Sequence, residues 1–102
     1  MDLSLDITAA ANATYVTVAG EIDLANHGEL ERTLQQLGAD RRHVELDLRG
    51  VTFIDSSGLR ILVEAHRARI DADASLTLRS PSAAVQRLLE ISGLSSHLDV
   101  SG

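Results

Sequence analysis

The chain has 102 residues, a formal net charge of −6 and no cysteine or lysine. This length predicts one domain that buries about two-thirds of its unfolded surface in a single core. The missing cysteines exclude disulfides, thiolate metal sites and cysteine nucleophiles. The acidic balance argues against direct nucleic-acid binding, because phosphates must be neutralised by clustered Lys and Arg. It favours instead a protein partner with a basic patch.

The N-terminal sequence and the overall hydrophobicity bear on location. Residues 1–6 contain neither the basic stretch nor the apolar run of a signal peptide, and no segment approaches the length of a membrane span. The absence of cysteine also fits a reducing compartment. These features predict a cytoplasmic protein without membrane insertion.

Two hydrophobic periodicities alternate along the chain, as is typical of an α/β domain. Apolar residues at helical spacing predict helices near 26–37, 57–71 and 81–92. Alternation of apolar and polar residues predicts strands, the first two paired as a hairpin, at Leu3–Ile7, Tyr15–Ala19, Val44–Leu48, Leu76–Leu78 and His97–Val100. Short right-handed crossovers then make most of the sheet parallel. The predicted fold is a mixed, mostly parallel sheet of four or five strands with three or four helices.

Local signals predict where the helices begin and end. Asn26 and Glu29 have capping-box spacing, which places the start of the first helix, and Gly38 is positioned to end it. Ser80-Pro81 predicts the start of the last helix, with the serine as cap and the proline in the first turn. Gly93 is positioned to end that helix.

One turn joins a strand end, a helix start and two hydroxyl groups: Asp55-Ser56-Ser57-Gly58. Functional loops collect at the carboxyl ends of strands in open α/β sheets. Free backbone N–H groups and the helix dipole tolerate negative charge there, so a phosphate on Ser56 need not melt the helix. Gly58 removes a side chain where another surface could approach the backbone. The structural alternative is that Asp55 or Ser56 merely caps the helix.

The run Val51–Leu59, V-T-F-I-D-S-S-G-L, resembles the signature of the anti-sigma factor antagonists. These are stand-alone members of the STAS family, the sulfate transporter and anti-sigma factor antagonist domains. Two further segments are similar to family segments in the expected order. Gly20-Glu21-Ile22-Asp23 matches the place where the second strand leaves the sheet, and Ser80–Leu94 matches the third-helix region. The resemblance covers essentially the whole chain and implies one STAS domain over residues 1–102.

The resemblance also implies what the turn does. In the family, a serine/threonine kinase that is also an anti-sigma factor phosphorylates the serine directly after the aspartate. That serine matches Ser56, with Ser57 as the second candidate. The unphosphorylated protein binds the kinase and frees the sigma factor, the phosphorylated form dissociates, and a serine phosphatase restores it. The chain itself is then no enzyme. The implied partner-binding residues are Asp23, Asp55, Ser56, Ser57, Gly58, Leu59 and Arg60.

The sequence departs from the family pattern in two respects. Relatives usually carry one more helix after the last strand, whereas this sequence stops at Gly102, shortly after Val100. Either the protein is trimmed there or another element finishes that edge, and a second copy of the chain, forming a homodimer, is one candidate. Arg60 places a bulky cation where a small residue is common, and it could pair with a phosphate on Ser56.

Other functional classes fit the sequence less well. The second hypothesis is a permanently docked STAS subunit of a membrane-associated lipid transport complex or of a stress-signalling scaffold, in which Ser56 would be only a cap. The intact D-S-S-G sequence favours the switch, since relatives with a fixed structural role often replace that serine. A serine hydrolase lacks the G-x-S-x-G elbow, and His66 lies too far along the helix. No P-loop supports nucleotide binding, and the histidines lack metal-ligand spacing, so we expect no cofactor and no metal.

Overall fold

The computed structural model describes residues 3–37, 43–94, 96 and 98–101. Within these residues, five strands form one sheet in the order β1-β2-β3-β4-β5. β1 pairs antiparallel with β2, and the other neighbouring pairs are parallel. The predicted mixed, mostly parallel sheet with three helices is confirmed. The elements in chain order are β1 (Leu3–Ala9), β2 (Ala13–Ile22), α1 (His27–Leu37), β3 (His43–Ile54), α2 (Ser56–Asp71), β4 (Leu76–Arg79), α3 (Ala83–Ser92) and β5 (Val100–Ser101).

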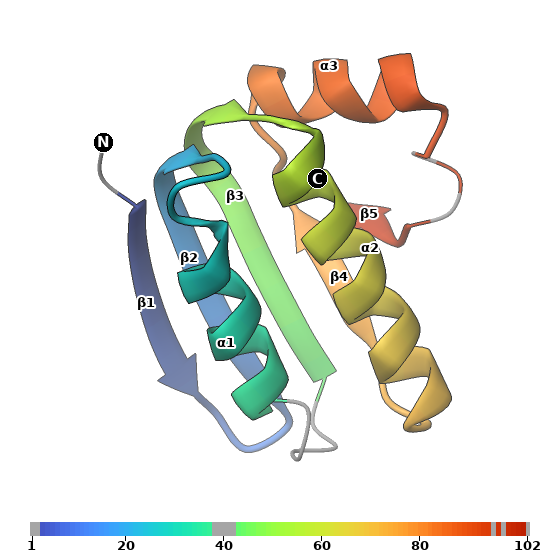
Figure 1. Cartoon of the computed structure of the whole chain (residues 1–102). Coiled ribbons are helices and arrows are strands. Elements are labelled where there is room, and N and C mark those ends of the chain that lie inside the picture. The colour runs from blue at the N-terminus through green and yellow to red at the C-terminus, as the bar shows by residue number, and fades with distance from the viewer. Residues whose placement is uncertain (1–2, 38–42, 95, 97, 102) are drawn as a thin grey trace.

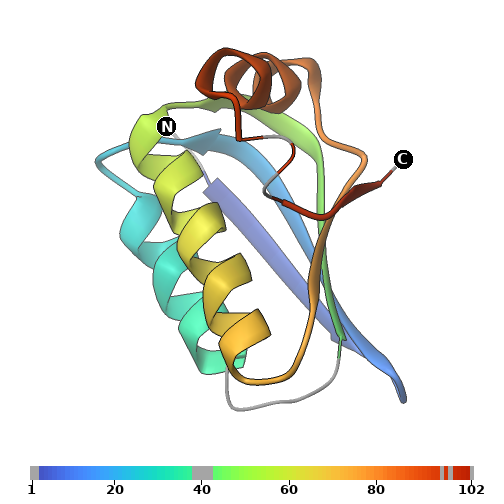
Figure 2. The same cartoon turned by 90° about the vertical axis from the view of Figure 1, so that its right-hand side faces the viewer.

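The helices are not spread evenly around the sheet. α1 and α2 lie side by side on one face, and no described helix covers most of the opposite face (Figure 2). α3 lies across the end of the sheet at which β3 passes into α2 (Figure 1). Each of α1 and α2 returns the chain to the start of the next parallel strand. The carboxyl ends of β2 and β3 and the starts of α1 and α2 therefore meet at one edge.

The core lies between α1, α2 and the sheet face that they cover. Alternate residues of β2 and β3, such as Val16, Val18 and Leu46, are fully buried. Leu30 from α1 and Leu62 from α2 complete the same cluster. Each such side chain contributes about 1.5–3 kcal/mol by leaving water, so this apolar layer provides most of the stabilisation.

β3 is longer than the sequence predicts, because it continues beyond Val44–Leu48 to Ile54. Register shifts interrupt its pairing with β2 at two places, and at each one β3 uses one more residue than β2. Near the first shift a Cβ on Gly50 would lie 2.9 Å from the Cβ of Ala19, so the bulged backbone approaches its neighbour too closely for a side chain. The extra residues break the strict alternation by which a strand is recognised.

The ends of α3 agree only in part with the prediction. Ser82, not Ser80, is the N-cap, so the predicted Ser80-Pro81 start is two residues early. Gly93 ends the helix as predicted, with φ 73° in the left-handed region where glycine is favoured. The predicted helix end at Gly38, and His97 in the predicted last strand, lie outside the described residues.

Candidate functional site

The turn between β3 and α2 is built around Asp55. The residue has extended backbone angles, φ −106° and ψ −178°, and is the N-cap of α2. Its Oδ1 accepts the backbone N–H groups of Ser57 at 3.0 Å and of Gly58 at 3.2 Å. The first turn of a helix leaves such N–H groups without intrahelical partners. The cap is therefore Asp55 and not Ser56.

The Asp55 carboxylate is held in its charged form. The Ser57 hydroxyl donates to Oδ1, and this bond lowers the pKa of Asp55 below the ordinary value of 3.8. Desolvation opposes the effect, whereas the N–H groups of Gly58, Ser57 and Leu24 lower the pKa further. Hydrogen bonds to the charged form outweigh desolvation here. Asp55 therefore carries a negative charge into the turn at neutral pH.

The two serines of the turn are not equivalent. Ser57 is half-buried, and its hydroxyl is committed to Asp55. Ser56 is exposed, and within the described part of the chain no group hydrogen-bonds its hydroxyl. It is also the first residue of α2, at the positive end of the helix dipole. A reagent can therefore reach the Ser56 oxygen without first breaking a hydrogen bond.

Two of the predicted partner-binding residues lie inside the fold. Leu59 is 4% exposed, and Gly58 is buried. A Cβ on Gly58 would lie 2.6 Å from Ile22 Cγ2 and 2.9 Å from Ile54 Cγ1. The surface that approaches Gly58 is thus the protein's own sheet end, and the missing side chain lets α2 start close to β2 and β3. Arg60, by contrast, is exposed.

Asp23 begins the neighbouring loop and has a clear structural role. β2 continues to the residue before it, so the chain leaves the sheet here and not at Gly20. Asp23 Oδ1 accepts the N–H groups of Ala25 at 2.9 Å and of Asn26 at 3.1 Å, and Asn26 Oδ1 accepts the N–H of Asp23 at 2.9 Å. This reciprocal pair has the geometry of a capping box. The predicted box of Asn26 and Glu29 is therefore wrong by three residues.

The two loops meet at the carboxyl ends of β2 and β3. The Asp55 N–H donates to the carbonyl of Ile22 at 3.2 Å, and the Leu24 N–H is among the groups that lower the pKa of Asp55. These contacts put the Asp23 segment beside the turn that holds Ser56. Leu24 is 75% exposed, and sequence reasoning missed it, since its one signal is an apolar residue outside both periodicities. An exposed leucine beside a charged turn is typical of a surface that contacts another protein.

Comparison with known proteins assigns the chain to a family. The family model described as "Mlab, STAS domain" matches residues 5–99. The chain belongs to the STAS domain family. The anti-sigma-B factor antagonist of Bacillus subtilis (strain 168) is 30% identical over 101 residues, which are 99% of this chain and 93% of that protein. The resemblance to the anti-sigma factor antagonists is therefore confirmed.

Solved structures share the fold of this STAS domain. An anti-sigma factor antagonist from Mycobacterium paratuberculosis superposes with a TM-score of 0.88 at 23% identity, over 98% of this chain and 86% of that chain. The anti-sigma factor antagonist SpoIIAA in its unphosphorylated form gives 0.80 at 16% identity, over 97% and 88%. Its phosphorylated form from Bacillus gives 0.74 at 16% identity, over 99% and 91%. At these identities the structures establish the fold alone.

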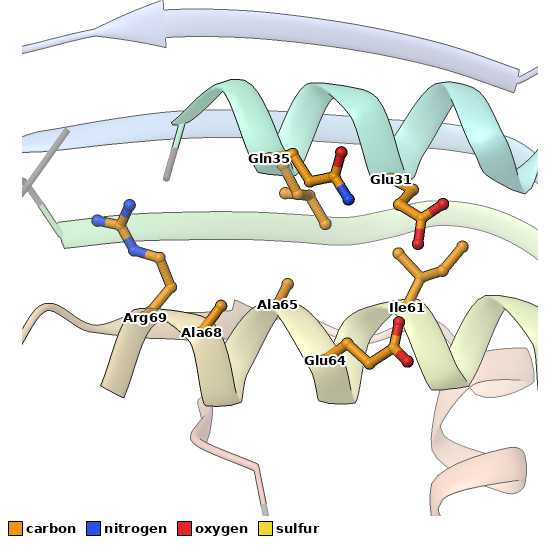
Figure 3. Close-up of a pocket in the computed structure, with 8 residues that line it drawn as sticks. Glu31, Gln35, Ile61, Glu64, Ala65, Ala68 and Arg69 are labelled. Carbon is orange, nitrogen blue, oxygen red and sulfur yellow. The ribbon is translucent and has the colours of Figure 1, made fainter. Parts of the chain in front are cut away.

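Away from the turn, a groove of about 310 Å³ lies between α1 and α2 (Figure 3). No three His, Asp or Glu side chains gather as metal ligands among the residues that the structure describes. None of the described helices is long and apolar enough to cross a bilayer. His66, considered above as the histidine partner of Ser56 in a serine hydrolase, is half-buried in α2. It lies about 15 Å along the helix axis from Ser56.

Proposed function

We propose that this STAS domain is an anti-sigma factor antagonist controlled by phosphorylation of Ser56. In its unphosphorylated form it binds an anti-sigma factor that is also a serine/threonine kinase, which frees a sigma factor for transcription. The phosphorylated form dissociates, and a serine phosphatase regenerates the active form, all in the cytoplasm. The name of the relative at 30% identity supports this role, and SpoIIAA, which shares the fold, exists in both phosphorylation states.

Ser56 carries this proposal because its hydroxyl alone in the turn is exposed and uncommitted. Ser57 is half-buried, and its hydrogen bond to Asp55 stabilises both the cap and the charge of the carboxylate, so a phosphate on Ser57 would disturb the cap. A phosphate on Ser56 lies at the helix start, where the dipole favours an anion, so it leaves the fold intact.

The same phosphate opposes docking. It adds about −1.5 to −2 charges at neutral pH, next to the ionised Asp55 and within the surface formed by Leu24 and Ser56. A partner that closes over this surface must strip water from the phosphate beside an existing negative charge. Like-charge contact of this kind costs several kcal/mol, and about 1.4 kcal/mol is a factor of ten in affinity. We therefore expect a loss of roughly two decades in affinity.

Titration calorimetry with a candidate anti-sigma factor kinase tests the proposal. Wild type and Ser56→Ala should bind alike, whereas phosphorylated protein, and more weakly Ser56→Asp, should lose affinity. Ser57→Ala is the matched control, since it should still be phosphorylated at Ser56, as mass spectrometry will show. Phosphate found only on Ser57 in the wild-type protein would contradict the assignment to Ser56. Equal binding by Ser56→Ala and Ser56→Asp would instead favour the permanently docked structural subunit.

A further inference from the structure

Arg60 lies on the exposed face of α2, one helical turn after Ser56 and one turn before Glu64. Its Nη1 pairs with Glu64 Oε2 at 3.3 Å, one turn toward the C-terminus. Ser56 lies one turn in the other direction, at the same spacing of four residues. Side chains four apart on a helix have Cβ atoms about 5–6 Å apart, so the Arg60 guanidinium is within reach of a group on Ser56.

Glu64 also belongs to the groove between α1 and α2. The groove has an apolar floor that includes Leu34, Ile61 and Ala65, and Glu31 and Glu64 stand on its rim. Figure 3 shows these two glutamates, from facing helices, directing their carboxylates toward the same end of the groove, on either side of Ile61. Arg60 therefore pairs with one of the two glutamates at this end of the groove.

We infer that Arg60 leaves Glu64 and pairs with the phosphate when Ser56 is phosphorylated. The charge at one end of the α1–α2 groove then depends on whether Ser56 is phosphorylated. The inference rests on the phosphorylation proposed above. With Arg60 withdrawn, the Glu64 carboxylate loses its ion pair and remains at the groove end beside Glu31. The phosphorylated and unphosphorylated forms then differ on two surfaces, at the turn and at the groove.

Three physical arguments favour the exchange. The phosphate carries about −1.5 to −2 charges against −1 for the Glu64 carboxylate. Guanidinium groups bind phosphate oxygens in a bidentate fork, whereas the pair with Glu64 uses one nitrogen. An acidic group placed four residues before a basic one stabilises a helix better than the reverse order. The Ser56–Arg60 order is the favourable one, and the existing Arg60–Glu64 order is the reverse.

The present ion pair is also weak enough to be displaced. The Arg60 and Glu64 side chains are 56% and 52% exposed. Exposed pairs of this kind are screened by water and salt and contribute little. The pair of Arg60 with the phosphate therefore has to displace only this weak, exposed ion pair with Glu64.

Phosphorus NMR on protein made with phosphoserine incorporated at position 56 tests the exchange without any kinase. A cation at the phosphate favours its dianion, so the ³¹P titration midpoint of wild type should lie about half a pH unit below that of Arg60→Gln at low salt. Arg67→Gln is the matched control: an exposed arginine of α2, about 16 Å along the axis from Ser56, whose loss should leave the midpoint as in wild type. The difference should shrink at about 1 M salt, where exposed charges are screened.

A second measurement reports on the α1–α2 groove through the side-chain amide of Gln35, which lines it. The ¹⁵N–¹H signals of this amide should shift on phosphorylation of wild type and should shift much less in Arg60→Gln. Equal ³¹P midpoints in wild type and Arg60→Gln would overturn the pairing. Unequal midpoints together with an unchanged Gln35 signal would overturn the claim that phosphorylation alters the groove. Since neither readout uses a partner, failure of Ser56 to control partner binding would refute the proposed function separately.

Discussion

Replacing Gly58 by alanine should destabilise the fold, although alanine is the better helix former. The added Cβ would lie 2.6 Å from Ile22 Cγ2 and 2.9 Å from Ile54 Cγ1, and both isoleucines belong to the packed core. Overpacking of this kind costs about 1–3 kcal/mol, whereas alanine gains at most about 1 kcal/mol over glycine in a helix. The free energy of unfolding should therefore fall by about 1–2 kcal/mol.

Gly28 in α1 is the matched control. A Cβ there would meet the end of the flexible Arg32 side chain at 3.5 Å and nothing nearer. Gly28→Ala should therefore be neutral or stabilising by up to about 1 kcal/mol. Urea unfolding followed by far-ultraviolet circular dichroism measures both variants. The reasoning is refuted if Gly58→Ala is as stable as wild type, or if both substitutions change stability in the same direction by similar amounts.

Two predictions concern the caps at the same edge of the sheet. Asp55→Ala should lower the free energy of unfolding by about 1 kcal/mol at neutral pH. The folded-state pKa of Asp55 lies below 3.8, so the charged cap stabilises above that value and its contribution is lost as the pH falls through the folded pKa. Urea titrations should show the gap between wild type and variant narrowing in acid, and a widening gap would contradict this cause. Asp23→Ala should cost about 1 kcal/mol by breaking the capping box, whereas Asp23→Asn keeps the acceptor oxygen and should melt like wild type. Equal melting temperatures for the two variants would show that Asp23 is no cap, and partner binding by Asp23→Asn reports the charge alone.

The helices could be predicted closely because their signal is local. Apolar stripes predicted 57–71 where α2 spans 56–71, and 81–92 where α3 spans 83–92. The caps were harder, since several capping residues stand close together and propensity cannot choose among them. Asp23, and not Asn26, is the first residue of the capping box because β2 ends at Ile22. β2 continues to Ile22 because its pairing with β3 continues.

The parts that sequence reasoning missed depend on contacts between distant segments. The bulges of β3 exist only relative to β2, so no pattern within β3 predicts them. Gly58 indicated an opening for a partner, but its neighbours are Ile22 and Ile54, which the chain brings together from two strands. The turn could be located from Asp55 and Ser56 in sequence. That the neighbouring hydroxyl of Ser57 is tied to Asp55 needed the geometry.

The uneven pairing of β3 predicts a difference in amide exchange along this strand. In the described ladder, β3 pairs with β4 over Val44–Asp47, whereas its last residues, to Ile54, pair with β2 alone. A strand held by one neighbour opens locally at a lower free energy than the global unfolding of the domain, and its amide hydrogens exchange sooner. We therefore expect the amide hydrogens near Ile54 to exchange before those of Val44–Asp47, which pair with a strand on either side.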